Sequence, residues 1–160
     1  MADAGRVLVI ACGALAREIT ALKRLNNWDR LTVSCLAPEL HNRPERITAE
    51  VLAAIAEGRE QGFEKILVGY ADCGTGGELD RALAPLGIER LPGAHCYEFF
   101  TGSQAFAALT EEEIGTYYLT DFLARAFDKL VWAGMGLDRH PELAEIYFGN
   151  YKRLVYLAQV

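Results

Sequence analysis

The stretch 6–22, RVLVIACGALAREITAL, decides the fold class of this chain. It opens with a short apolar run rich in β-branched residues, which is typical of a buried strand. The apolar residues Leu15, Ile19 and Leu22 then recur at the spacing of one helix face. The stretch therefore predicts a strand, a tight turn and a helix.

The same pattern of strand and helix repeats along the chain. Apolar runs predict further strands at 31–36, 65–70, 88–91, 116–119 and 153–160. Apolar residues at helical spacing predict helices that carry Ile47, Val51, Leu52 and Ile55, then Leu79, Leu83 and Leu86, and then Phe122, Ala126 and Leu130. Thr120 or Asp121 is the predicted N-cap of the last of these helices.

Strands that alternate with helices need right-handed crossovers, which make the strands parallel and place helices on both faces of the sheet. The prediction is an α/β protein: a three-layer sandwich with a mainly parallel, five- or six-stranded sheet, Rossmann-like or flavodoxin-like. The length of 160 residues fits one domain, 1–160, and no linker divides it. No helix follows the strand at 153–160, which an edge position, a partner's sheet in a homo-oligomer, or a missing C-terminal segment would each explain.

Charge and hydropathy limit the kinds of partner. The net charge of −6 repels a phosphate backbone, and no Lys- or Arg-rich run offsets it, so nucleic acid is not an expected partner. The first apolar segment, 7–15, is too short to cross a membrane and lacks the charged leader of a signal peptide. We therefore expect a cytoplasmic protein without membrane contact, in which grouped cysteines indicate a metal or catalysis more often than a disulfide.

Cysteine and histidine side chains follow several predicted strands at the point where each strand ends. Cys12 follows the first strand, His41 the second, Cys73 the third, and the pair His95 and Cys96 the fourth. Because ligands of open α/β sheets bind beyond the carboxyl ends of the strands, we expect these residues to gather at one edge of the sheet.

Thiolate and imidazole groups at one edge predict a metal centre. The thiolates of Cys12, Cys73 and Cys96 suit zinc or an iron–sulfur cluster. For zinc, His41 or His95 would be the fourth ligand, whereas a cluster would leave one iron open to a small-molecule ligand. His41 is also the candidate acid–base catalyst. No C-x-x-C pair is present, which excludes a zinc finger.

Other interpretations of the same residues stay open. Each cysteine taken alone is typical of a buried packing residue, and this is the expectation for Cys35 inside its strand. His41 is equally typical of a capping or surface residue before a helix. Two of the cysteines would instead form a redox-active disulfide if their Cα atoms lie within about 7 Å of each other.

Glycines after two of the strands predict a cofactor-binding loop. Gly13 follows the first strand, and Gly74, Thr75 and Gly76 lead from the third strand into a helix. Free N–H groups at the start of a helix attract phosphate or carboxylate. Ordinary turn formation is the alternative explanation, because the run matches no phosphate-binding fingerprint.

Several phrases of the sequence together resemble one family. They are Ala11-Cys12-Gly13, Leu40-His41-Asn42-Arg43-Pro44, Gly69-Tyr70, Cys73-Gly74, Cys96, Thr101-Gly102-Ser103 and Gly115-Thr116-Tyr117-Tyr118-Leu119-Thr120. In this order they resemble the family called domain of unknown function 1638. The resemblance implies an association with anaerobic one-carbon metabolism and corrinoid-dependent methyltransferases, but no particular reaction. It also implies aspartate before Cys96, where this chain has His95, which counts against His95 as a ligand.

Two hypotheses about function follow. The leading one is an enzyme, or an accessory protein of an enzyme, that holds a zinc or iron–sulfur centre on Cys12, Cys73 and Cys96 with His41. The alternative is a non-catalytic module that binds a corrinoid, a metal in transit or a methyltransferase partner.

Overall fold

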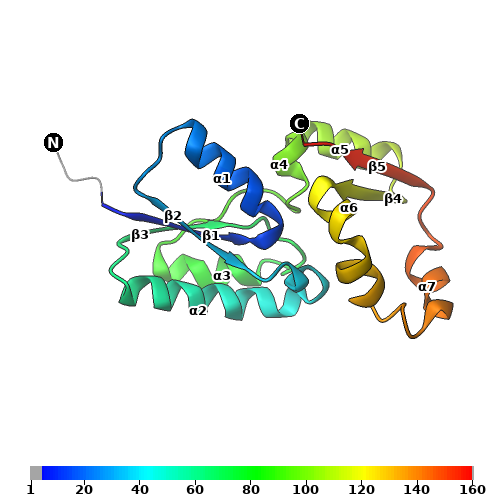
Figure 1. Cartoon of the computed structure of the whole chain (residues 1–160), viewed down its shortest axis with the longest axis horizontal. Coiled ribbons are helices and arrows are strands. Elements are labelled where there is room, and N and C mark those ends of the chain that lie inside the picture. The colour runs from blue at the N-terminus through cyan, green and yellow to red at the C-terminus, as the bar shows by residue number, and fades with distance from the viewer. Residues whose placement is uncertain (1–4, 160) are drawn as a thin grey trace. The chain divides into compact units, whose positions relative to one another are not determined.

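The computed structural model describes residues 5–159 of the chain (Figure 1). The chain divides into two compact units, unit 1 (Met1–Ala94) and unit 2 (His95–Val160), and each has its own sheet. That residues 1–160 form a single domain stays a prediction.

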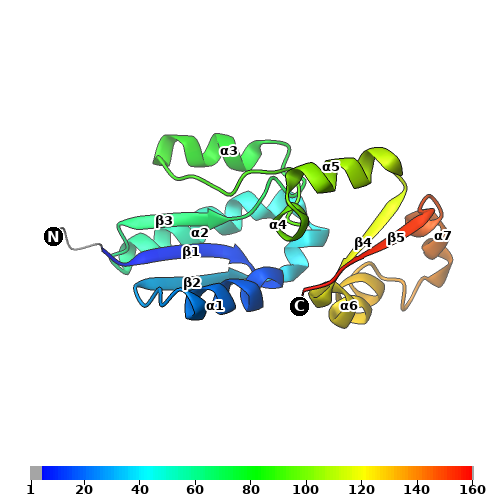
Figure 2. The same ribbon diagram turned by 90° about the horizontal axis from the view of Figure 1, so that it is seen from above.

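The sheet of unit 1 has three parallel strands. They are β1 (Val7–Cys12), β2 (Leu31–Leu36) and β3 (Lys65–Gly69). Strand β1 lies in the middle, so that Val7 is opposite Leu31 on one side and Lys65 on the other (Figure 2). This arrangement confirms the α/β class and brings the carboxyl ends of β1 and β3 side by side.

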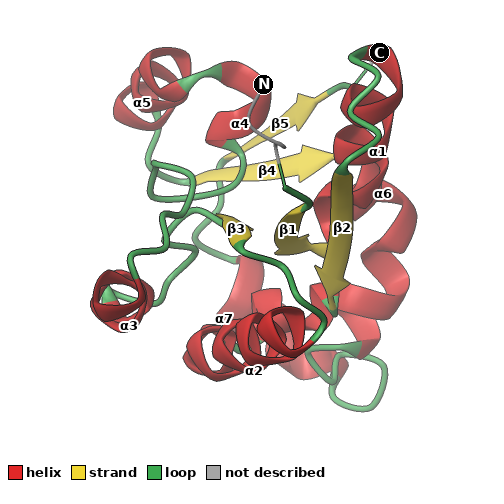
Figure 3. Cartoon of the chain, turned by 90° about the vertical axis from the view of Figure 1, so that its left-hand side faces the viewer, coloured by secondary structure: helices red, strands yellow, loops and turns green. Residues whose placement is uncertain are grey.

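Helices of unit 1 lie on both faces of its sheet. Helix α1 (Ala16–Leu25) lies on one face, and α2 (Ile47–Glu60) and α3 (Glu78–Leu83) lie on the other (Figure 3). Short 3₁₀ turns flank them: η1 (Gly13–Leu15), η2 (Pro38–Asn42), η3 (Pro44–Arg46) and η4 (Ala84–Leu86). Both faces of the sheet therefore carry helices, as the alternating sequence pattern predicts.

The core of unit 1 lies where α2 and α3 pack on the sheet. Its most deeply buried large side chains are Ile10, Ile47, Val51, Val68, Leu79 and Leu83. Burying one such side chain contributes about 1.5–3 kcal/mol. Gly58 of α2 lies directly over Leu8 of β1, and a Cβ at this position would overlap the Leu8 side chain. The glycine therefore lets the helix approach the sheet closely.

The expected five- or six-stranded sheet is wrong. Segment 88–91, predicted as a strand, makes a single parallel bridge between Val68 and Arg90. Pro92 has no N–H to continue the pairing, and Gly93 follows it with a φ of 116°. The two remaining predicted strands pair with each other in unit 2.

The sheet of unit 2 has two parallel strands, β4 (Thr116–Thr120) and β5 (Arg153–Leu157). Thr116 lies opposite Arg153 in the register. The Arg153 guanidinium donates to Glu112 at 2.8 Å and to the Thr116 hydroxyl at 2.9 Å, which ties β5 to the helix before β4. Both strands were expected from the sequence, but as members of one large sheet.

The helices of unit 2 are short. They are α4 (Glu98–Thr101), α5 (Ser103–Glu112), α6 (Asp121–Phe127), the π-helical segment η5 (Asp128–Ala133), the 3₁₀ turn η6 (Pro141–Leu143) and α7 (Ala144–Phe148). The Thr120 hydroxyl accepts a hydrogen bond from the Leu123 N–H at 3.2 Å, which confirms Thr120 as the N-cap of α6. Within residues 5–159, no helix is both long enough and apolar enough to cross a membrane.

Candidate thiol site

Cys12 is the last residue of β1 and is buried, with 8% of its surface exposed. The next residue, Gly13, begins the turn into α1. A Cβ on Gly13 would lie 2.9 Å from the Leu36 carbonyl oxygen and 3.0 Å from Cδ of Pro38. The ends of β1 and β2 are therefore packed so closely that only glycine fits after Cys12. Gly13 has a structural role, and its predicted cofactor role stays a prediction.

Cys73 lies in the loop after β3 and is partly buried against the core of unit 1. Its φ is +50°, a left-handed conformation that is rare for residues other than glycine. The Cys73 N–H donates to the Ala94 carbonyl oxygen at 2.9 Å, and the Asp72 N–H donates to the Gly93 oxygen at 3.0 Å. These two bonds hold the cysteine in an unusual backbone conformation, which is common at functional sites.

Cys12 ends β1, and Cys73 lies in the loop after β3, the strand next to β1. Both Cys73 and Cys35 interact electrostatically with the Cys12 thiol. Burial raises the pKa of the Cys12 thiol, and Cys73 and Cys35 raise it further, whereas the Ala14 N–H and the Tyr70 side chain partly lower it. Cys12 is therefore a protonated thiol at neutral pH in the metal-free chain. Tyr70 is a member of this site that sequence reasoning missed.

The glycine-rich loop after Cys73 is organised by Asp72. The Asp72 carboxylate accepts from the Thr75 hydroxyl at 2.8 Å, from the Gly77 N–H at 2.8 Å and from the Gly76 N–H at 3.1 Å. Burial raises the pKa of Asp72, but these three hydrogen bonds outweigh it, so the net pKa is lowered and the carboxylate is ionised. The donors that were expected to bind a phosphate or carboxylate ligand thus already bind a carboxylate of the chain itself.

His41 lies in η2 after β2, as expected from the sequence. Its side chain keeps an exposed surface, but the protein atoms around the ring lower its pKa by desolvation. A neutral imidazole can accept a proton or bind a metal. Its role as ligand or acid–base catalyst stays a prediction. The expectation for Cys35 is wrong: this thiol is exposed, because β2 is an edge strand.

His95 and Cys96 are the first two residues of unit 2. Cys96 is buried, with 9% of its surface exposed, and its sulfur lies 3.7 Å from Nδ1 of His95. The same nitrogen accepts the Tyr97 N–H at 3.3 Å, and the His95 and Tyr97 rings stack at 4.0 Å between centroids. His95 is thus held against Tyr97 and Cys96 by contacts within unit 2.

The described donor side chains do not form a complete metal site. Across residues 5–159, no group of three or more His, Cys, Asp or Glu side chains is placed so that it could hold a metal ion. A structural zinc site needs four ligands, so an ion on Cys12 and Cys73 would need two more.

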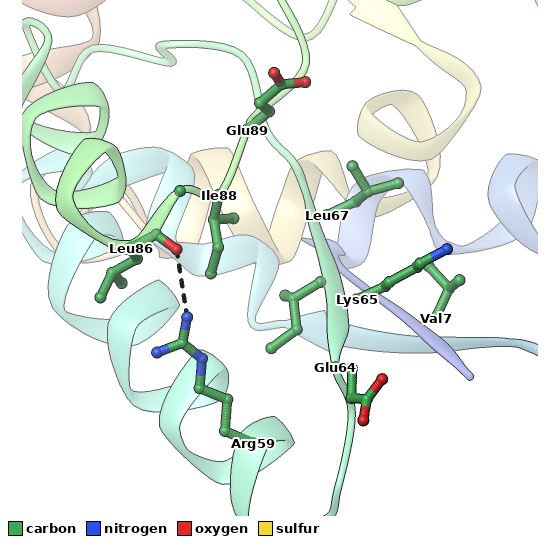
Figure 4. Close-up of a pocket in the computed structure, with 10 residues that line it drawn as sticks. Val7, Arg59, Glu64, Lys65, Leu67, Leu86, Ile88 and Glu89 are labelled. Carbon is green, nitrogen blue, oxygen red and sulfur yellow. Dashed lines mark hydrogen bonds between the residues drawn. The ribbon is translucent and has the colours of Figure 1, made fainter. Parts of the chain in front are cut away.

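A separate pocket of about 400 Å³ lies at the opposite ends of the same strands (Figure 4). Val7 and Lys65, which begin β1 and β3, line it together with Arg59 of α2. Arg59 donates a hydrogen bond of 3.4 Å to the Leu86 carbonyl oxygen. Ligands of parallel sheets bind at the carboxyl edge, so the position of this pocket does not favour it as the candidate site.

Comparison with known proteins identifies a family but no activity. No curated protein and no solved structure gives a significant match to the chain. The family described as "Protein of unknown function (DUF1638)" matches residues 35–160. The matched segment contains His41, Cys73 and Cys96, and it begins after Cys12. Because the match covers most of the chain, this protein belongs to the DUF1638 family.

Proposed function

We propose that the chain holds a thiolate-ligated metal centre, zinc or an iron–sulfur cluster, built on Cys12 and Cys73. The observation that supports it is that Cys12 ends β1 and Cys73 follows β3, the neighbouring parallel strand, with an electrostatic interaction between the two thiols. This edge is where α/β sheets bind ligands, and thiolates are the ligands that both metals prefer.

The environment of the pair is consistent with metal binding coupled to proton release. In the metal-free chain, burial keeps the Cys12 proton in place. A metal ion would displace that proton, because the ligand is the thiolate. The Ala14 N–H and the Tyr70 side chain, which already interact with the Cys12 sulfur, would then stabilise its negative charge. When bound, the metal would act as a Lewis acid or lower the pKa of a bound water or thiol.

The remaining ligands are proposed from the sequence alone. Cys96 is the third thiolate of the proposal, and His41 or His95 is the fourth ligand or the acid–base group. The resemblance to the family is likewise the only support for a role in anaerobic one-carbon metabolism with corrinoid-dependent methyltransferases. A cytoplasmic location is proposed from the sequence alone.

Metal and sulfide analysis of anaerobically purified protein tests the proposal. We expect a stoichiometric metal, with acid-labile sulfide and visible absorption if it is a cluster, and with neither if it is zinc. Cys12→Ser and Cys73→Ser should each lose most of the metal. Cys35→Ser is the matched control, because Cys35 is an exposed thiol on β2. A metal-free protein whose stability is unchanged when Cys12, Cys73 and Cys96 all become serine would refute the proposal.

A second candidate function is a non-catalytic partner-binding module. The observation that favours it lies on β5, where Leu154 is 60% and Tyr156 is 53% exposed. Exposed apolar side chains next to each other are typical of interaction surfaces. Titration with cobalamin and with a purified corrinoid methyltransferase tests this function. Binding without turnover would support it, and no binding at high micromolar concentration would contradict it.

A further inference from the structure

We propose that unit 2 contains a binding site of its own, a pocket that takes a small aromatic carboxylate, with the ligand ring among aromatic side chains and the carboxylate at Lys152. The pocket has a volume of about 400 Å³, which is in the range of small-molecule sites. We call it the aromatic pocket, because five rings line it: Tyr117, Phe127, Trp132, Phe148 and Tyr151. Its described lining lies between residues 117 and 154, so the site does not depend on the proposed metal centre.

The alternation of side chains along two paired strands builds one wall of the aromatic pocket. Tyr117 and Leu119 lie on the same face of β4, and Leu154 is the partner of Tyr117 on β5. Tyr118 lies between them and faces the other way, where its ring lies 5.0 Å from that of Phe106, measured between centroids. Helices α6 and α7 pack on the Tyr117 face, and α5 packs on the Tyr118 face (Figure 1). The aromatic pocket therefore lies on the Tyr117 face of the strands.

The aromatic rings meet at corners and do not form a stack. The Tyr117 ring meets the Tyr151 ring at an interplanar angle of 81° and the Phe148 ring at 78°. It meets the Phe127 ring at 75°. A flat ring that enters such a corner can stack on one side chain and meet the next edge-on, and these are the two favoured geometries of aromatic pairs. The pocket therefore suits an aromatic ligand ring.

The remaining aromatic side chain of the pocket, Trp132, comes from the π-helical segment η5. Segments of π-helix are rare and occur frequently at functional sites. Trp132 is 37% exposed, and across the pocket Tyr151 is 44% and Leu154 is 60% exposed. Neighbouring apolar side chains that stay exposed in this way are typical of binding surfaces. A bound ring would remove their apolar surface from water.

The ionic side chains of the aromatic pocket favour an anion. Within residues 5–159 they are Lys152 and Arg153, both cations. The Arg153 guanidinium is already paired with Glu112 at 2.8 Å, whereas Lys152 is exposed and brings a positive charge to a chain whose net charge is −6. A ligand that complements this lining has an apolar ring and one negative group. An aromatic carboxylate has both.

A larger apolar pocket in unit 1, of about 960 Å³, provides an internal comparison. Acidic and basic side chains both line it, Asp29 and Glu89 with Arg30 and Arg90, so its lining favours neither sign of charge. It also contains Trp28. The chain has two tryptophans, and each of them lines a different pocket. The two indole rings therefore report separately on the two pockets.

Fluorine NMR of the full-length chain labelled with fluorotryptophan tests the proposal. Trp28→Phe and Trp132→Phe assign the two resonances. The probes are indoleacetate and indoleacetamide, which share a ring and differ in charge. We expect indoleacetate to shift the Trp132 resonance with a Kd below about 1 mM and to leave the Trp28 resonance in place. Indoleacetamide should bind about fivefold more weakly, because it cannot pair with a lysine.

Three variants test the residues of the pocket. Lys152→Gln should weaken the binding of indoleacetate about fivefold and leave that of indoleacetamide unchanged, because it removes only the ion pair. Lys23→Gln is the matched control, since it removes the same charge from α1 of unit 1 and should change neither affinity. Tyr151→Ala removes one ring of the pocket and should weaken both probes about tenfold.

Measurements on the unmodified sequence keep the proposal open to refutation even if a variant does not fold. A Trp132 resonance that stays in place at about ten times the expected Kd overturns it. A shift at Trp28 alone, or equal shifts at both tryptophans, also overturns it, because the probe then binds elsewhere or without preference. Equal affinities for the two probes overturn the assignment of a carboxylate ligand.

Discussion

In unit 1 three parallel strands carry helices on both faces, whereas in unit 2 two parallel strands carry short helices and a π-helical segment. Side chains at the centre of unit 1, such as Ile10 and Val51, are fully buried. In unit 2 the strand β5 leaves Leu154 and Tyr156 more than half exposed. The comparison indicates that the deep core forms where α2 and α3 together cover one face of three strands, which the two-stranded sheet of unit 2 does not provide.

In unit 2, aromatic rings take over part of the packing that aliphatic side chains provide in unit 1. The Tyr117 ring meets Tyr151 and Phe148 edge-on, with centroids 5.0 and 5.8 Å away. A pocket of about 400 Å³ stays open beside these rings, next to Trp132 of the π-helical segment. Unit 1 thus has the larger buried core, and both units keep some large apolar side chains at the surface, such as Leu67 in unit 1 and Leu154 in unit 2.

The largest expected difference between the two units is in the free energy of unfolding that is lost when one aliphatic side chain in each is truncated to alanine. Ile10→Ala removes a fully buried side chain from β1 and should cost about 2–5 kcal/mol of unfolding free energy, because the packed core cannot close over the cavity. Leu154→Ala removes a side chain that is 60% exposed and should cost less than about 1 kcal/mol. Urea unfolding followed by circular dichroism measures both. Equal costs would show that the surface of β5 is buried against a partner.

The next largest expected effect is the pH dependence of stability that the buried Cys12 thiol of unit 1 causes. The pKa of Cys12 is raised above its ordinary value of 9.0, mainly by burial, so the folded chain keeps a proton that the unfolded chain releases. The contribution of the Cys12 thiol to the free energy of unfolding is therefore fully present below pH 9.0. It falls as the pH rises above that value, by at most about 1.4 kcal/mol per pH unit. Cys12→Ala should remove most of this fall in the metal-free chain, as measured by urea unfolding at about pH 8 and about pH 10.

Unit 2 supplies the contrast for the pH experiment. Burial raises the pKa of Tyr117 from its ordinary value of 10.0, so its contribution is lost only at higher pH than that of Cys12. Cys35→Ala is the second control, because the pKa of this exposed thiol is also raised by partial burial. A larger effect from Cys35→Ala than from Cys12→Ala would contradict the account of the buried thiol.

The sequence predicted those parts of the molecule that depend on local pattern. The strands β1, β2 and β3, the buried face of α2 and the cap at Thr120 all follow from the spacing of apolar and capping residues. The number of strands in the sheet could not be predicted in this way. Whether segment 88–91 extends β3 depends on how Pro92 and Gly93 direct the chain, and the apolar run before them does not show this.

In the candidate site, too, some features could be predicted from the sequence and others could not. The positions of Cys12 and Cys73 after adjacent strands could be predicted, because parallel strands end at one edge. The role of Asp72 could not, since it depends on hydrogen bonds made by the folded loop. A carboxylate just before a run of glycines is the signal that could have revealed Asp72 as the organiser of that loop.

The smallest expected effect concerns the N-cap of α6 in unit 2, which depends on a local hydrogen bond. Thr120→Ala removes the hydroxyl that accepts the Leu123 N–H at 3.2 Å and should cost about 1 kcal/mol. Thr120→Ser keeps the hydroxyl and should restore most of that stability, as judged by the urea midpoint. Because Thr120 is buried, a loss in Thr120→Ser as large as in Thr120→Ala would assign the effect to packing of the Thr120 methyl group. Unit 2 would then resemble unit 1 in depending on close packing more than its exposed aromatic surface indicates.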